Sequence, residues 1–161
     1  MRAIITADNK KFEVECIGCS IAKKEVDIIG GIIAETENFI LANDFEYPIP
    51  GFLIIGSKKH IQNITEFTQA EYGEVMDLLF KARKGMLDIL KIEQATIIQE
   101  EGTQGSHFHI WLFPWYDWMK EIGTGVSSVR QIMKYAKENN GTKDVLERII
   151  SESEKLRDFI K

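Results

Sequence analysis

Two of the three histidines in this 161-residue chain lie close together in the stretch QGSHFHIWLFPW, residues 104–115. In a strand, residues two apart point to the same face, so His107, His109 and Trp111 are expected to share one face. The apolar residues between and after them predict a buried stripe on the other face. Imidazole binds metals and attacks phosphorus, and each role uses a defined ring nitrogen. The pattern fits equally two half-buried polar side chains with no chemical role.

A second reactive pair is formed by Cys16 and Cys19 in the motif CIGC, and these are the two cysteines of the chain. A redox pair would be expected in a thioredoxin-like βαβ setting, which the following segments do not indicate. A structural zinc site needs two more ligands, which two of His60, His107 and His109 would have to supply. From the residues alone, a zinc site, a redox pair and chance remain open.

The composition is that of a globular protein, with 44% hydrophobic and 28% charged residues, and the length suits one domain with or without an appendage. The net charge of -5 argues against broad binding of nucleic acid, which needs a basic surface. The sequence has neither an apolar run of membrane-spanning length nor a signal-peptide pattern, so we expect a cytoplasmic protein without a membrane partner.

The pattern of apolar residues predicts the elements that position these motifs. Residues 10–15, 31–44, 52–57, 95–101 and 107–113 have strand character, and apolar residues from Gln69 to Ile92 recur at helical spacing. Residues 127–161 are expected to be helical with a break near Asn140–Gly141. In the last segment an apolar stripe predicts a helix that docks on its own domain or on a sister subunit. The fold class is therefore α+β.

Together the motifs resemble the histidine triad superfamily of nucleotide hydrolases and transferases. Its signature alternates three histidines with apolar residues, often before a proline, and HFHIWLFP at residues 107–114 matches it with His107 and His109 as the first two members. Four further features match in order: CIGC, Asp44 seven residues before Gly51, KKH at residues 58–60, and a long helix. The resemblance covers about residues 13–118. It implies an antiparallel sheet with one long helix for residues 1–120, and a helical extension for residues 121–161.

The resemblance also implies how the reactive residues divide their roles. In zinc-containing members, and in the related galactose-1-phosphate uridylyltransferases, the two cysteines, the KKH histidine and the first triad histidine hold the metal. This implies a closed, structural Zn²⁺ site at Cys16, Cys19, His60 and His107. The middle histidine is the family's nucleophile, which implies ping-pong chemistry through a covalent nucleotidyl-histidine at His109.

Substrate-binding residues follow from the same match. Asp44 corresponds to the residue that accepts hydrogen bonds from ribose hydroxyls, although a turn aspartate explains it equally well. Gln104 and Ser106 lie in the loop before the triad, where an amide and backbone N–H groups can contact phosphate. Trp111 takes the place of the third histidine. Its indole N–H donates one hydrogen bond but cannot shuttle a proton.

Other positions depart from the family pattern. The loop before the triad is shorter, and Glu100 and Glu101 stand where the family has a phosphate-binding asparagine. Because a carboxylate repels phosphate unless a cation or proton intervenes, these side chains point away or the ligand differs. The three tryptophans, Trp111, Trp115 and Trp118, are expected mainly to pack in the core, with a base-stacking wall as the alternative.

The predicted function is a nucleotidyl hydrolase or transferase that acts on a nucleoside phosphate derivative, with a homodimer expected from the resemblance. Two alternatives remain. One is a catalytically weakened nucleotide-binding protein with a structural zinc. The other is a zinc-stabilised interaction module that works through its helical tail.

Overall fold

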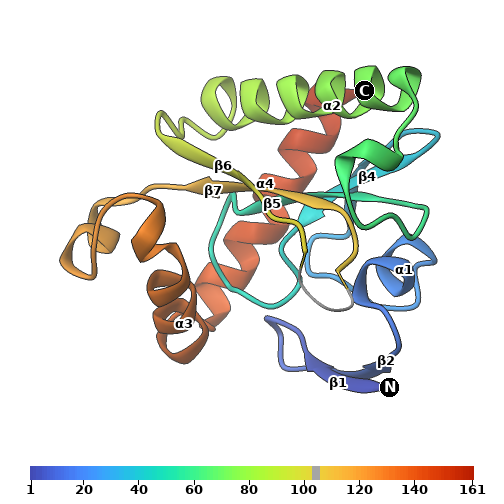
Figure 1. Ribbon diagram of the computed structural model, residues 1–161. Coiled ribbons are helices and arrows are strands. Elements are labelled where there is room, and N and C mark those ends of the chain that lie inside the picture. Colours follow the sequence, from blue (N-terminus) through green and yellow to red (C-terminus); the bar gives the residue numbers. More distant parts are fainter. Residues whose placement is uncertain (103–105) are drawn as a thin grey trace.

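A five-stranded antiparallel sheet forms the centre of the molecule. The computed structural model describes residues 1–102 and 106–161 (Figure 1). The sheet has the strand order β3-β4-β5-β7-β6, and every neighbouring pair is antiparallel. Its strands are β3 (Ile32–Glu35), β4 (Phe39–Asn43), β5 (Leu53–Ser57), β6 (Ala95–Gln99) and β7 (His109–Pro114). The predicted run 31–44 thus forms two strands of a hairpin, and the α+β class is confirmed.

The two faces of the sheet have different chemical characters because side chains alternate along each strand. The predicted apolar stripe is buried, with Phe108, Ile110 and Leu112 at 6% exposure or less. These residues pack with β4 and β5 against helix α2 (Gln69–Asp88), which lies along this face in Figure 1. His109 and Trp111 point to the opposite face. In the strand register they lie beside Gly56 and Ile54 of β5.

Helix α2 begins where its capping residues allow. The Thr68 hydroxyl accepts from the Glu71 amide, and the Glu71 carboxylate accepts from the Thr68 amide, which is a capping box. The predicted apolar stripe of α2 is buried, but the helix ends at Asp88 rather than at Ile92. Lys91 adopts a left-handed φ of 60°, and the Ile92 amide turns back to the Met86 carbonyl. No glycine or proline marks this earlier helix end, so it could not be predicted from the residues.

The N-terminal segment adds a hairpin and a short helix, which pack on Ile40 and Ala42 of β4. Strands β1 (Arg2–Ile5) and β2 (Lys11–Val14) pair in a separate two-stranded sheet, joined by a turn in which Asn9 has a φ of 64°. Helix α1 (Ile17–Ala22) follows directly. The prediction included β2 but missed β1, although its run of Ala, Ile and Thr before an Asp-Asn turn is typical of a hairpin strand.

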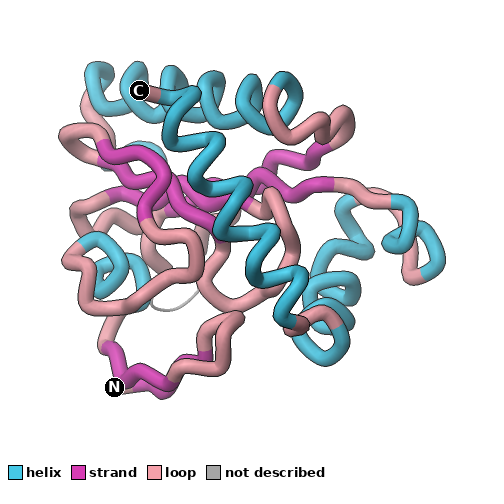
Figure 2. Tube along the Cα trace, turned by 180° about the vertical axis from the view of Figure 1, so that it is seen from behind, coloured by secondary structure: helices cyan, strands magenta, loops and turns pink. Residues whose placement is uncertain are grey.

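Two C-terminal helices, α3 (Val129–Asn139) and α4 (Lys143–Ile160), flank the sheet, with the break between them where it was predicted. Ile132 and Met133 of α3 pack against Phe52 and Phe113. Helix α4 lies against α2, β3 and β4, and in Figure 2, which shows the molecule from behind, it crosses in front of the sheet. Three short 3-10 helices complete the described chain, at Ile64–Glu66, Asp117–Glu121 and Val126–Ser128. The division of the chain at residue 120 stays a prediction.

Buried polar contacts fix helix α4 in place. The Asn43 side chain donates to the buried Ser153 hydroxyl, and Arg157 donates to the carbonyls of Gly30 and Ile32. The predicted stripe of this helix therefore docks on its own chain through Ile149, Ser153 and Leu156. Across residues 1–102 and 106–161, none of the helices combines the length and the apolar character that crossing a bilayer requires.

Candidate functional site

Four side chains from three distant segments converge next to helix α1. Cys16 caps α1, Cys19 lies within it, His60 follows β5 and His107 precedes β7. One ligand atom of each lies within 4.8 Å of all the others. The Cys16 Sγ is 3.3 Å from His60 Nδ1 and 3.4 Å from His107 Nδ1, and the Cys19 Sγ is 3.4 and 3.6 Å from the same two atoms.

These distances fit a tetrahedral zinc site. With Zn–S bonds of about 2.3 Å and Zn–N bonds of about 2.0–2.1 Å, sulfur and nitrogen ligands of one ion lie about 3.6 Å apart. Burial raises the pKa of the Cys19 thiol, and the adjacent Cys16 sulfur raises it further. Holding Cys19 as a thiolate near neutral pH therefore calls for a cation beside it. The four residues can hold a metal, as the resemblance implied.

The orientation of His107 selects the ring nitrogen that faces the sulfurs. His107 Nε2 lies 2.6 Å from the Ser57 carbonyl oxygen, and since a carbonyl only accepts, Nε2 carries the proton. Nδ1 therefore presents its lone pair to the cysteines, as metal binding requires. Burial lowers the pKa of His107, which keeps the ring neutral. Gly18 packs on this ring, and a Cβ added there would lie 2.4 Å from the His107 Cγ and Cδ2 atoms.

His109 is tied to the cluster through the backbone of His107. Its Nδ1 lies 2.8 Å from the His107 carbonyl oxygen, so Nδ1 donates and carries the proton. This tautomer leaves the lone pair on Nε2. Any change at the four-residue cluster that moves the His107 backbone will therefore also move the His109 ring.

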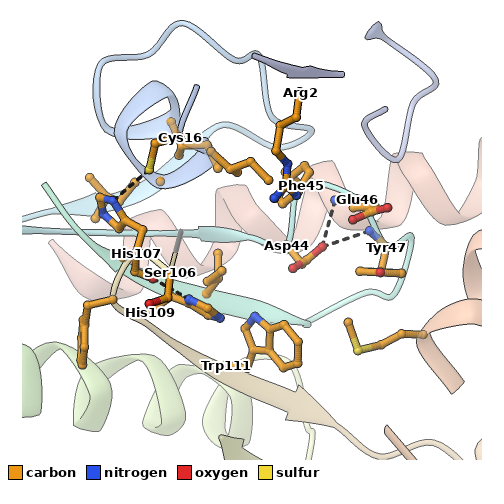
Figure 3. A pocket seen from close by; sticks show the side chains of 18 of the residues that line it. Arg2, Cys16, Asp44, Phe45, Glu46, Tyr47, Ser106, His107, His109 and Trp111 are labelled. Atoms are coloured by element: carbon orange, nitrogen blue, oxygen red, sulfur yellow. Dashed lines mark hydrogen bonds between the residues drawn. The ribbon is translucent and has the colours of Figure 1, made fainter. Parts of the chain in front are cut away.

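A cavity of about 290 Å³ lies beside this histidine. His109 and Trp111 line one side of it, and Asp44 and Tyr47 line another (Figure 3). Ser106 also lines the cavity and is half-buried. Gln104 falls outside the described residues.

Asp44 is 3% exposed and faces this cavity. Its Oδ1 accepts from the amides of Glu46 and Tyr47 at 2.9 and 3.0 Å, which is the turn geometry that its sequence context also predicted. Burial raises the pKa of the Asp44 carboxyl to about 6, against a smaller opposite effect of the two amides. Since Oδ1 is occupied by the backbone, Oδ2 is the atom available to a ligand.

The three tryptophans divide between cavity and packing. Trp111 lines the cavity, with its ring centroid 5.5 Å from that of His109, and it packs edge-on against Phe52 at 5.8 Å. The Trp115 indole N–H donates to the Thr96 hydroxyl, and the ring centroid of Trp118 lies 5.7 Å from that of Tyr135. The last two thus pack between elements, while Trp111 combines packing with a place on the cavity wall.

The two glutamates that depart from the family pattern are both engaged. The Glu100 carboxylate accepts from Arg130 of α3, and the Glu101 carboxylate accepts from the Ile64 amide at 2.7 Å. Arg130 itself lines the cavity and places its Cζ 5.5 Å from the centre of the Trp111 ring. The negative charge of Glu100 is therefore paired with the positive charge of Arg130.

Several cavity residues escaped the sequence analysis, notably Arg2, Tyr47 and Arg130. Arg2 comes from the missed strand β1, and Arg130 comes from a helix that the resemblance does not cover. Tyr47 follows Asp44 by three residues, so a search around that aspartate would have found it. Sequence spacing offered no signal for Arg130, because only the packing of α3 brings it to the cavity.

Comparisons with solved structures give the fold its family context. The chain is similar to a Zn-bound histidine triad family protein from Mycobacterium smegmatis, with a TM-score of 0.62, 15% identity and 91% and 93% of the two chains covered. It is also similar to a hypothetical histidine triad nucleotide-binding protein from Sulfolobus tokodaii, with a TM-score of 0.63, 21% identity and coverage of 90% and 91%. It is also similar to a histidine triad family hydrolase from Clostridium thermocellum, with a TM-score of 0.52, 25% identity and coverage of 71% and 99%.

These likenesses show that the chain has the histidine triad fold, as its motifs predicted. Scans of the sequence against models of protein families and against curated proteins find no match.

Proposed function

We propose that this protein is a nucleotidyl hydrolase or transferase that uses His109 as its nucleophile. One observation carries the proposal. The His107 carbonyl fixes the proton of His109 on Nδ1, and the ring lines the cavity, so the free lone pair on Nε2 is available to a bound phosphorus. The nucleotide-binding and hydrolase names of the structural neighbours agree with this assignment.

The reaction proceeds in two displacements. His109 Nε2 attacks the α-phosphorus, a bond from Nε2 to phosphorus forms, and the bond from phosphorus to the leaving group breaks. The ring becomes a nucleotidyl-imidazolium whose Nδ1–H still donates to the His107 carbonyl. Water or an ionised oxygen of an acceptor phosphate then attacks phosphorus, the bond to Nε2 breaks with its electron pair returning to Nε2, and neutral His109 is restored. When water attacks, its proton passes to the bulk solvent. Each displacement has a lower barrier than a single direct transfer.

Zinc is the metal proposed for the cluster of Cys16, Cys19, His60 and His107. Four protein ligands close the coordination sphere, so when bound the ion supplies structural cross-linking rather than an open position for substrate. The residues themselves link the cluster to catalysis, because His107 presents Nδ1 to the sulfurs while its carbonyl orients His109.

Asp44 and Ser106 are proposed to hold the nucleotide. The Oδ2 atom of Asp44 accepts from ribose hydroxyls when the carboxyl is ionised, which its raised pKa places above about pH 6. Ser106 immediately precedes the zinc ligand His107, and its hydroxyl donates to phosphate oxygens. The role predicted for Gln104 remains a prediction.

A turnover assay tests the proposal. The protein is incubated with a dinucleoside polyphosphate, a nucleoside phosphoramidate and a nucleotide sugar, and released nucleotide is measured with and without an acceptor phosphate. The variant His109→Asn keeps an N–H donor in the place of Nδ1 but lacks the nucleophile, so it controls for packing. Turnover should fall by at least about 1,000-fold in this variant.

The alternatives predict different results in the same assay. Nucleotide binding without turnover by the parent protein would favour the weakened nucleotide-binding protein. Absence of both would leave the interaction module.

The homodimer stays a prediction. Its support is a stripe on the outer face of α2, where Tyr72, Met76 and Phe80 recur every four residues and are 45%, 42% and 67% exposed. Strand β6, at the edge of the sheet, adds Ile97 at 49% exposure. A partner that covers this surface would bury apolar side chains that a monomer leaves in water.

A further inference from the structure

Trp111 raises a chemical question about the leaving group. An indole N–H donates a hydrogen bond but has no proton to release, so this position cannot act as a general acid. The proposed reaction nevertheless breaks the bond to a leaving group, where negative charge develops. Some other feature of the cavity must meet that charge, or the leaving group must carry it unaided.

Arg130 is a cationic side chain in the lining of the same cavity. The ring of Trp111 separates it from the nucleophile: the His109 ring lies 5.5 Å from the Trp111 ring, and the Arg130 Cζ lies 5.5 Å from the centre of the same Trp111 ring. All three side chains line one cavity. The cation–π contact holds the guanidinium against the indole, in line with the preference of arginine for aromatic faces.

Glu100 fixes the guanidinium without consuming all of its donors. Its carboxylate accepts from Nη2 of Arg130. A guanidinium has five N–H groups, so donors remain for a ligand. The glutamate that would repel phosphate if it were alone instead positions a cation.

The charged side chains of the cavity are mixed, because Glu15, Asp44 and Glu46 line it together with two arginines. Arg2, on strand β1, is the second cationic side chain among the described cavity residues. The carboxylate of Glu46 on the opposite wall is paired with Lys137 of α3. Helix α3 thus contributes Arg130 and Met133 to the cavity lining, and its Lys137 pairs with Glu46, so the predicted helical extension takes part in forming the cavity.

We propose that Arg130 binds the leaving group and thereby restricts the substrate to nucleotides whose leaving group departs as a phosphate. This inference rests on the proposed function. Nε2 of His109 bonds to the α-phosphorus, the bond from that phosphorus to the bridging oxygen breaks, and the electron pair leaves on a phosphate-terminated group held by Arg130. Such a group is a stable anion near neutral pH and needs no proton. The amine of a phosphoramidate needs one, and an arginine cannot provide it.

The substrate class is therefore a nucleoside α–β phosphoanhydride, such as a dinucleoside polyphosphate or a nucleotide sugar.

The specificity test compares kcat/KM for a phosphoanhydride and a phosphoramidate of one nucleoside, in the parent protein and in Arg130→Gln. The parent should prefer the phosphoanhydride, and Arg130→Gln should reduce that activity by about 100-fold with far less effect on the phosphoramidate. Arg130→Lys should retain part of the activity. Lys155→Gln removes a positive charge from the exposed face of α4 and controls for net charge.

A binding measurement separates this inference from the proposed function. In His109→Asn, which does not turn over, calorimetry compares a nucleoside monophosphate with the corresponding diphosphate. The diphosphate should bind about tenfold tighter, and adding Arg130→Gln should remove this advantage while monophosphate affinity remains. This result would support the clamp even if the parent failed to turn over either substrate. Equal affinities, or an equal loss for both substrates in the kinetic test, would overturn the role of Arg130. The Arg130 side chain is about two-thirds exposed, so the variants are expected to fold.

Discussion

Replacing Asp44 by asparagine should make the protein more stable at neutral pH. Asp44 is 3% exposed, and the pKa of its carboxyl is raised from 3.8 to about 6 because burial disfavours the charged form. The folded state therefore holds the proton more tightly than the unfolded chain. The resulting stability is fully present below pH 3.8 and is lost as the pH rises through about 6. A shift of about 2 pKa units corresponds to roughly 3 kcal/mol.

Asparagine keeps an oxygen that accepts from the amides of Glu46 and Tyr47 and has no charge to bury. The free energy of unfolding of Asp44→Asn, minus that of the parent, should therefore rise with pH. Roughly 1.4 kcal/mol of this rise falls between pH 5 and pH 8. Guanidinium unfolding at several pH values measures both proteins, and taking the difference cancels the pH dependence that the metal ligands impose on both.

Asp158→Asn is the matched control. This exposed carboxyl pairs with Lys161, which lowers its pKa, so its titration lies below the measured range. Its difference from the parent should stay flat from pH 5 to pH 8. A flat difference for Asp44→Asn as well would refute the assignment of a buried, proton-binding carboxyl at the cavity. If the variant gains stability but loses affinity for a ribonucleotide, the group serves binding at a cost in stability.

The remaining predictions concern the metal cluster, the docked helix and the dimer. Gly18→Ala places a methyl group against the His107 ring and should weaken zinc binding by about 10- to 100-fold in a competition titration with a chromogenic chelator. Gly73→Ala, on α2 with open space around it, should leave zinc affinity unchanged and raise stability by about 0.5–1 kcal/mol. Removal of metal with a chelator should lower the melting temperature and abolish turnover together, and restored zinc should recover both; unchanged turnover in the metal-free protein would contradict the link through the His107 carbonyl. Leu156→Ala, at 1% exposure, should cost about 2–5 kcal/mol in denaturant unfolding, and a cost below 1 kcal/mol would show that α4 contributes little to the core. Phe80→Glu should convert a dimer to a monomer in sedimentation equilibrium, whereas a parent that is already monomeric would contradict the predicted homodimer.

Much of the site was predictable because its residue types are rare in this chain. With two cysteines and three histidines, the family pattern could assign each one to a single role, and the structure brings Cys16, Cys19, His60 and His107 together as that pattern implied. The alternation around His109 predicted the buried stripe because a strand has only two faces, and apolar residues occupy one of them.

The parts that sequence reasoning missed depend on packing between distant segments. Arg130 is one of many charged surface residues in the sequence, and only the docking of α3 on Phe52 and Phe113 carries it to Trp111. Glu100 appeared unfavourable for phosphate because its partner lies 30 residues away. The early end of α2 depends on a left-handed residue, Lys91, whose side chain has no preference for that conformation.

The most direct test of the central claim is the mass of the intact protein after brief incubation with a nucleotide substrate. The sample is quenched without acid, because phosphohistidine bonds are acid-labile, and free nucleotide is assayed in the same tube. We expect an increase equal to one nucleotide, absent from His109→Asn, or rapid release of nucleotide by the parent alone if hydrolysis outruns trapping. An adduct or release that persists in His109→Asn, or neither of them in the parent, would contradict catalysis through His109.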